Sequence, residues 1–355
     1  MSAVRGGPGG VDFGHPVRVL RRGPVAVRIG LRPVAVTVAL AAVAVGTGLA
    51  ALGSGSYEIP LGDVAGALLG RADGRVHMVV VEWRLPRVLL GLLFGAALGA
   101  SGAIFQSLTR NPLGSPDIIG FATGSYTGAL VVILLTGGGY AMVAGGALAG
   151  GLATAAVVYL LAWNRGVSGF RLIIVGIAVS AMLAAANAWL ILRAELDAAM
   201  SAAIWGAGSL ARSSWEQVGP VLACLAVLVP LTALLAPRLG VLEMGDDTAA
   251  ALGLRVERLR LALVVVGVAL TALVTAAAGP ISFIALAAPQ LARRLTGRTG
   301  VGVGSAAAMG AALLAASDWA AQRVIAPNQL PVGVVTVCIG GGYLLWLLIR
   351  EARTS

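Results

Sequence analysis

The chain has 355 residues, of which 58% are hydrophobic and only 11% are charged. Soluble globular domains are typically about 25% charged, so this composition excludes one and predicts a polytopic membrane protein. All 25 basic residues are Arg. The absence of Lys excludes a P-loop ATPase, whose Lys binds the nucleotide phosphates, and Schiff-base catalysis. Because the charges lie between apolar runs, nucleic-acid binding is not expected either.

Apolar runs long enough to cross a bilayer, about 20 residues each, recur along the chain. Six of them are residues 33–53, 88–108, 118–136, 141–163, 172–192 and 218–236. The next run, 261–292, is too long for one span and contains Gly279-Pro280, a pair that is expected to divide it into two helices. Residues 301–325 and 331–349 complete a predicted all-α fold of ten transmembrane helices.

The distribution of Arg predicts the orientation, because basic residues accumulate in short cytoplasmic segments. With ten spans and a cytoplasmic N-terminus, 18 of the 25 Arg residues lie inside. We therefore expect an Arg-rich cytoplasmic tail over 1–32, a transmembrane domain over 33–350 and a cytoplasmic tail over 351–355. No short apolar segment with a cleavage site precedes the first span, so we do not expect a signal peptide.

Two segments outside the predicted membrane region are long enough to have a function. The external stretch 54–87 includes an amphipathic portion, 59–69, that is expected to lie on the surface as a helix. The cytoplasmic stretch 237–260 has an acidic start, a run of small residues and an Arg-rich end. This charge order suits the dipole of a short helix, although a plain solvated loop is the alternative.

Small and polar residues within the spans are candidates for packing or function. Glycines at spacings of three to four are expected to let helices approach closely, and a translocation path would use the same residues; they are Gly91, Gly95, Gly99 and Gly102, with Gly145, Gly146, Gly150 and Gly151. Asp318 is the clearest ionisable group inside a span. We expect it to bond backbone ends or an Arg near the outer face, with docking or gating as the alternative.

The remaining reactive side chains indicate no catalytic or metal site. Cys224 and Cys338 lie in apolar stretches and are expected to be small core residues. His15 and His77 lie outside the predicted spans. Because no catalytic triad, metal motif or carboxylate pair is evident on a membrane face, an enzyme is not expected.

Six ordered segments resemble one family, the FecCD/BtuC-type permease subunits of ABC importers for ferric siderophores, haem and cobalamin. They are RLPR at 84–87, SGAIFQ at 101–106, RNPLGSPD at 110–117, WGAGSL at 205–210, AGPISFIAL at 278–286 and LPVGVVT at 330–336. Within the family, residues 170–176, 242–249 and 340–344 are most similar to permeases for ferric enterobactin, a catecholate siderophore. Where the family usually has His in the eighth span, this chain has Gln290.

This resemblance implies a BtuC-like (type II) fold and a multi-pass location in the cytoplasmic membrane. It implies a second homologous permease subunit, two copies of an ATPase subunit that bind ATP and Mg, and an extracytoplasmic binding (lipo)protein. The chain itself would bind no cofactor, and its cargo would be a ferric siderophore. A cobalamin or haem permease, or a stand-alone secondary carrier with a site at the broken helix, remains an alternative.

The resemblance also implies roles for individual residues. A segment that couples the chain to the ATPase would contain Glu243, Met244, Gly245, Asp246, Asp247, Ala251, Leu252 and Gly253. Arg84 and Arg87 would meet acidic residues of the binding protein, unless they only anchor the second span at the headgroups. Ser168, Gly169 and Phe170 would form a cytoplasmic gate. Residues expected in helix packing or along the path are Gly91, Gly95, Gly99, Gln106, Asn111, Pro112, Gly279 and Pro280, with Asp318 and Gln290 as intramembrane polar groups.

Overall fold

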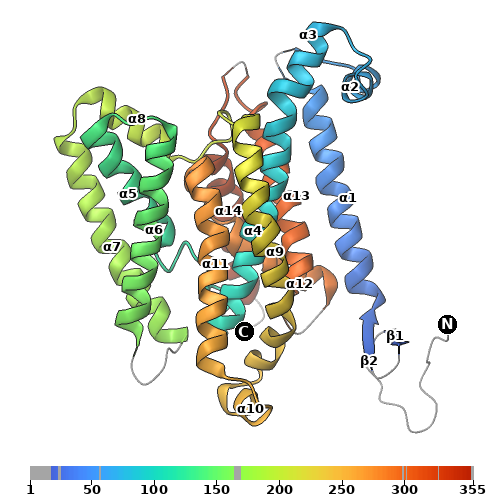
Figure 1. The fold of residues 1–355 in the computed structure, drawn as a ribbon, viewed down its shortest axis with the longest axis vertical. Coiled ribbons are helices and arrows are strands. Elements are labelled where there is room, and N and C mark those ends of the chain that lie inside the picture. The colour runs from blue at the N-terminus through green and yellow to red at the C-terminus, as the bar shows by residue number, and fades with distance from the viewer. Residues whose placement is uncertain are drawn as a thin grey trace.

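The computed structural model describes residues 17–22, 25–55, 57–163, 169–297, 300, 302–326 and 328–352. These residues are almost entirely helical (Figure 1). The exception is an antiparallel hairpin that precedes the first long helix, formed by β1 (Val17–Arg22) and β2 (Val25–Gly30). The described chain is therefore mostly helical, as predicted, and only the Val- and Arg-rich segments of this hairpin form strands.

Within the described residues, the ten longest helices make up the body of the molecule. They are α1 (Leu31–Gly53), α4 (Leu85–Thr109), α5 (Phe121–Thr136), α6 (Tyr140–Ala162), α7 (Gly169–Arg193), α9 (Trp215–Glu243), α11 (Val256–Ala278), α12 (Ile284–Thr296), α13 (Val303–Ala321) and α14 (Val332–Ala352). Shorter helices are α2 (Leu61–Leu68), α3 (Gly74–His77), α8 (Leu196–Gly206) and α10 (Asp246–Ala251). A π-helical segment, η1 (Met78–Arg84), joins α3 to α4, so that the helix is continuous over Gly74–Thr109.

The described part of the chain contains six helices that are long and apolar enough to cross a membrane. They are α1, the continuous helix Gly74–Thr109, α6, α7, α9 and α11, while α5 and residues Val332–Trp346 of α14 are apolar but shorter. Six such helices make the chain a multi-pass membrane protein. The predicted break at Gly279-Pro280 is confirmed, because α11 ends at Ala278 and α12 begins only at Ile284.

Helix α4 forms the centre of the fold. It packs against α9, α11, α12 and α13, while α5 to α8 form a separate group on one side and α1 lies on the opposite side (Figure 1). In the continuous helix Gly74–Thr109, which includes α4, 72% of the most apolar 18-residue stretch is buried, against 11% of the corresponding stretch in α7. The outer helices therefore present their apolar side chains outward, as expected of helices that face lipid or another membrane subunit.

Glycines allow α4 to lie close to its neighbours. A Cβ atom on Gly99 would overlap the backbone of Ala306 in α13, and one on Gly102 would overlap the carbonyl of Ala285 in α12. Helices α5 and α6 meet in the same way, because Gly128 and Gly150 face each other's backbone. These glycines therefore allow close helix packing, as their spacing predicted. Gly145 is an exception, because no atom of another helix lies within 4 Å of its Cβ position.

Replacing Gly102 by Ala is expected to destabilise the folded chain by about 1–3 kcal/mol, the usual cost of overpacking. The carbonyl that the new methyl group meets belongs to the backbone of Ala285 and cannot rotate away. Gly46→Ala in α1 is the matched control, because nothing lies within 4 Å of its Cβ position. Thermal unfolding in detergent measures both variants, and equal melting temperatures would contradict the close-approach account.

The two cysteines are placed differently from the expectation. Both Cys224 in α9 and Cys338 in α14 are exposed, not part of a core. Their helices carry other exposed apolar residues, including Val227 and Val337. In a membrane protein the outward surface is as apolar as the interior, so an apolar sequence neighbourhood does not distinguish a core position from an outward one.

Candidate functional site

The turn between α9 and α11 carries the short helix α10 at the lower end of the molecule (Figure 1). Gly245 precedes α10 with φ 117°, and Gly253 follows it with φ 83°. Residues other than Gly rarely adopt backbone conformations with such positive φ angles, so the two glycines define where α10 begins and ends. Because α9 extends to Glu243 and α11 begins at Val256, the predicted stretch 237–260 is mostly helical.

Asp246 ties α10 to two other helices. Its carboxylate accepts hydrogen bonds from Arg110, which follows α4, and from Nη2 of Arg260 in α11, at 3.0 Å to each oxygen. The Arg260 side chain is only 7% exposed, and its Nη1 also donates to Glu257 Oε1 at 3.2 Å. A charged side chain this buried needs such partners, so α10 is fixed to the ends of α4 and α11.

A second contact joins the end of α9 to α4. Ser107 Oγ donates a 2.6 Å hydrogen bond to Glu243 Oε1, and Arg110 Nε donates to the carbonyl of Leu242 at 3.3 Å. Two of the acidic residues predicted for coupling, Glu243 and Asp246, are therefore occupied within the chain. Their carboxylates hold the turn in place.

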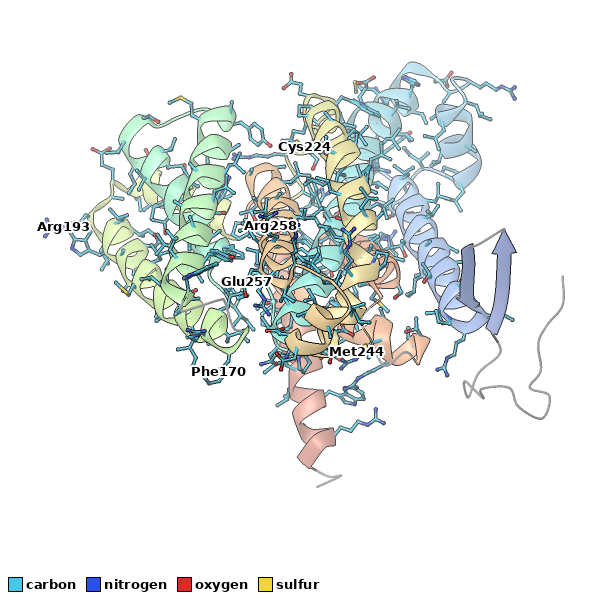
Figure 2. All side chains as sticks on the ribbon, turned by 60° about the horizontal axis from the view of Figure 1, so that its bottom comes forward. Phe170, Arg193, Cys224, Met244, Glu257 and Arg258 are labelled. Atoms are coloured by element: carbon cyan, nitrogen blue, oxygen red, sulfur yellow. The ribbon has the colours of Figure 1, made fainter. Side chains whose placement is uncertain are left out.

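The remaining predicted coupling residues form an exposed face on α10 and its flanks. The exposed fraction is 67% for Met244 and 64% for Leu252, and Asp247 and Ala251 are exposed as well. Ala249, on the opposite side of α10, is fully buried. Figure 2 shows Met244 at this end of the molecule. Exposed apolar residues on a polar turn are typical of a surface that contacts another protein. We call Met244, Asp247, Ala251 and Leu252 the α10 face.

The predicted gate lies beside the end of α4. A Cβ atom on Gly169 would come within 2.5 Å of Thr109 Cα, so the first residue of α7 packs directly on the last residue of α4. Phe170 projects from the same turn and is 72% exposed (Figure 2). Ser168, the third predicted gate residue, lies outside the described residues.

Three of the sequence motifs meet where α11 breaks. Ser209 N donates to the carbonyl of Ala278 at 2.7 Å, and Gly333 N donates to the carbonyl of Gly208 at 3.1 Å. Gly208, with φ 66°, and Gly279, with φ 75°, pack against each other's segments. Non-helical backbone at membrane depth requires internal partners of this kind. We call this region the broken-helix junction.

Asp117, the last residue of the motif at 110–117, also lies at this junction, although the sequence predicted no role for it. Its Oδ2 accepts a 3.2 Å hydrogen bond from the backbone N–H of Phe283, which has a left-handed φ of 70° directly before α12. A carboxylate at a helix N-terminus is favoured by the helix dipole. The sequence feature that could have indicated this role is the position of Asp117 at the start of an apolar run, directly after Ser115-Pro116.

Two buried glutamines, one on α4 and one on α12, tie α12 to α4 and to the turn that follows α4. Gln106 Nε2 donates to the carbonyl of Leu286 at 2.9 Å, and Gln290 Nε2 donates to the carbonyl of Pro112 at 2.7 Å. Gln290 Oε1 also accepts from the Tyr343 hydroxyl at 3.2 Å. Asn111 lies in the turn after α4, next to Pro112. Its Oδ1 accepts a hydrogen bond from the backbone N–H of Leu113, which shapes this turn.

Asp318 pairs with Arg87 near the upper end. The guanidinium forms a bidentate contact, Nη2 to Oδ1 at 2.8 Å and Nε to Oδ2 at 3.0 Å, and Nη1 also donates to Gln329 at 2.7 Å. The side chains are 12% and 6% exposed. Asp318 thus bonds an Arg, as expected, but that Arg is not its sequence neighbour Arg323, which lies over the ring of Trp319.

The two arginines proposed for docking are both turned toward the chain. Arg84 donates to the carbonyl of Leu52 at 2.7 Å and to that of Tyr57 at 2.6 Å. Arg87 is largely buried against Asp318. Their guanidinium groups therefore hold the loop after α1 and the end of α13 in place, and direct docking of a second protein stays a prediction.

A cavity of about 950 Å³ opens between the α5–α8 group and the ends of α9 and α11. Its lining combines apolar side chains with charged ones, among them Trp205, Leu273, Glu195, Arg212 and Glu216. These residues lie at the end opposite α10. No pattern in the sequence predicts the cavity, because its walls come from five separate helices, α5, α6, α8, α9 and α11.

Comparison with known proteins places this arrangement among transport proteins. The model of the FecCD transport family matches residues 40–350. The ferric enterobactin transport system permease protein FepG of Escherichia coli is 53% identical over 84% of this chain and 91% of that protein. The iron(3+)-hydroxamate import system permease protein FhuG of Bacillus subtilis is 37% identical over 79% of this chain and 86% of that protein.

A solved structure has the same fold. It is that of a metal-chelate type ABC transporter in an inward-facing conformation, with a TM-score of 0.77 and 28% sequence identity. The match covers 89% of this chain and 99% of the other.

Proposed function

Because this chain belongs to the FecCD transport family, we propose that it is the permease subunit of an ABC importer that carries a ferric siderophore across the cytoplasmic membrane. The observation that carries this proposal is the 53% identity to a ferric enterobactin permease, extended over 84% of the chain. That identity favours a catecholate siderophore as the cargo. The residues around α10 and the broken-helix junction fit this function.

We assign ten spans to the permease, namely α1, α4, α5, α6, α7, α9, α11, α12, α13 and α14. The end that carries α10 faces the cytoplasm in this assignment, since Arg32 at the start of α1, Arg110 after α4, and Arg293 and Arg294 in the last turn of α12 lie there. The N-terminus and the C-terminus share that side. The short α12 reaches only part of the way across, and the break before it lies within the membrane.

The α10 face would seat in a cleft of the ATPase subunit, of which the importer has two copies. ATP and Mg bind to that partner, and the permease chain contributes no catalytic group. A second, homologous permease subunit would cover part of the outward apolar surface, most of all α7, of which only 11% is buried within the chain. A siderophore-binding protein would dock at the opposite end.

Hydrogen bonds and packing supply a path for the motion. A displacement of α10 would act on α4 through Asp246 and Arg110, and on α11 through Asp246 and Arg260. The end of α4 contacts the start of α7 at Thr109 and Gly169. Closure of the ATPase would therefore move the exposed Phe170 at the gate by way of the end of α4.

The proposal is tested by purifying the tagged full-length chain in mild detergent and identifying what remains bound. We expect an ATPase and a second related permease, in a ratio of two ATPase copies to one of each permease. Recovery of the chain alone, active in uptake driven by a proton gradient, would replace the proposal with a secondary carrier. Preferred binding of haem or cobalamin by the binding protein that works with this importer would overturn the siderophore assignment.

A further inference from the structure

Arginine and aromatic side chains gather where α12 and α14 end, beside the start of α1. The Arg294 guanidinium carbon lies 5.2 Å from the ring centre of Trp346 and 5.9 Å from that of Tyr343. Arg350 lies over the same Trp346 ring at 5.5 Å. Arg32 donates from Nε to the carbonyl of Leu295 at 3.1 Å. We call these five side chains, Arg32, Arg294, Tyr343, Trp346 and Arg350, the basic-aromatic cluster.

Two guanidinium groups in the cluster keep N–H donors available. Within the described part of the chain, Arg294 makes ring contacts but no hydrogen bond or salt bridge. A guanidinium that lies over a ring uses its flat face, so its N–H groups still point outward in the plane. Among the described residues, Arg32 donates a hydrogen bond from Nε only. Gly297, with φ 66° and no Cβ, leaves room for the terminal nitrogens of Arg32 beside the end of α12.

Three of the described carboxylates at this end of the molecule have partners outside the cluster. Asp246 is held by Arg110 and Arg260, and Glu257 by Arg260. Glu243 accepts from Ser107. The cluster therefore carries an excess of positive charge, and its donor geometry matches a phosphate, which planar guanidinium groups bind with two parallel hydrogen bonds.

Exposed apolar side chains lie directly beside the charges. Leu295 on α12, and Leu345 and Ile349 on α14, are exposed next to Arg294 and Arg350. Trp346 is about half exposed. Arginines next to an aromatic ring and aliphatic side chains are typical of the boundary between lipid headgroups and hydrocarbon.

We propose that the basic-aromatic cluster binds the phosphate of an anionic phospholipid in the cytoplasmic leaflet. The guanidinium groups of Arg294 and Arg32 would bind the headgroup phosphate, and the acyl chains would lie along Leu345 and Ile349. The charge of the site and its apolar border favour a lipid over a protein partner. The surface proposed for the ATPase is built on other elements, because α10 packs mainly on α9 and α11, whereas α12 and α14 carry most of this cluster.

Native mass spectrometry of the detergent-solubilised full-length chain tests this site. The protein is titrated with phosphatidylglycerol and, separately, with phosphatidylcholine of the same acyl chains. We expect preferential retention of phosphatidylglycerol, with affinity reduced about fivefold in R294Q, since one Arg near a lipid surface contributes about 1 kcal/mol. R32Q should show a reduction in the same direction.

The matched control is R193Q. Arg193 also lies over a Trp ring, that of Trp189 at 5.6 Å, but it is the last residue of α7, far from the basic-aromatic cluster. R193Q should retain phosphatidylglycerol as the unchanged chain does. Equal retention by R294Q and R193Q, with melting temperatures matching the unchanged chain, would overturn the proposal. Full competition by inorganic phosphate would reduce the site to a general anion site. Loss of ATPase capture in R294Q with unchanged lipid retention would assign the cluster to a protein contact.

Discussion

Replacing Met244 and Leu252 together by Ala is expected to abolish both capture of the ATPase and transport, while the chain still folds and inserts. Both side chains are about two-thirds exposed, so their removal leaves no cavity within the chain. Apolar residues at the centre of a protein interface can each contribute more than about 2 kcal/mol to binding, and losing two would reduce affinity by more than about a hundredfold. Copurification of the ATPase and ATP-dependent uptake measure the effect.

The matched control for this variant is Leu261→Ala. Leu261 is also an exposed apolar residue at this end of the chain, but it lies on α11 beyond the α10 face. It should leave ATPase capture unchanged. Normal uptake by the Met244/Leu252 variant would show that the α10 face is not the coupling surface. Asp246→Ala is a poorer test, because it also removes a partner of the buried Arg260 and would disturb the fold.

Replacing Asp318 by Ala is expected to destabilise the folded chain by about 3–5 kcal/mol, the usual cost of removing one partner from a buried ion pair. The Arg87 side chain, only 12% exposed, would keep its charge and lose both carboxylate oxygens. Gln329 would remain as its one side-chain partner. Denaturant or thermal unfolding in detergent measures the loss.

The double variant R87M/D318L separates the charge effect from packing. Replacing both buried charges by apolar side chains removes the unpaired cation, so this variant should regain most of the lost stability. Asp63→Ala is a suitable control, since Asp63 lies in an exposed turn of α2. A loss below about 1 kcal/mol for D318A would mean that the pair is effectively solvated, as surface pairs are.

Much of the fold could be predicted because a membrane restricts the possible structures. Backbone polar groups in lipid must be satisfied internally, so each long apolar run had to be a helix. The break at Gly279-Pro280 followed from the missing N–H of Pro and the conformational freedom of Gly. By contrast, the stretch 54–87 was predicted to lie outside the transmembrane helices, whereas the structure has one continuous helix over Gly74–Thr109.

Positions of individual side chains were harder to predict from sequence. Arg is common on exposed docking surfaces, yet the long side chains of Arg84 and Arg87 turn inward. The Arg84 guanidinium reaches the carbonyls of Leu52 and Tyr57, and that of Arg87 reaches the carboxylate of Asp318. The partner of Asp318 is 231 residues away in the chain. Contacts over such separations depend on how helices pack, which apolar periodicity alone does not determine.

Asp117 shows the same limit at the broken-helix junction. Its motif was noticed, but the N–H that it accepts from belongs to Phe283, 166 residues further on. Likewise, Asp246 was predicted to be a surface group of the coupling segment, whereas Arg260 binds it from within the chain. In both places the chemistry of the residue was evident from the sequence, and the identity of its partner required the structure.

The central claim is that this chain is the permease half of an ATP-driven importer for a ferric catecholate siderophore. The most direct test is uptake of radioiron-labelled siderophore into proteoliposomes that contain this chain, the second permease and the ATPase, with the binding protein supplied on the outer side. We predict accumulation that requires ATP and that stops when Met244 and Leu252 are both Ala. Accumulation that requires a proton gradient and is indifferent to ATP would contradict the claim.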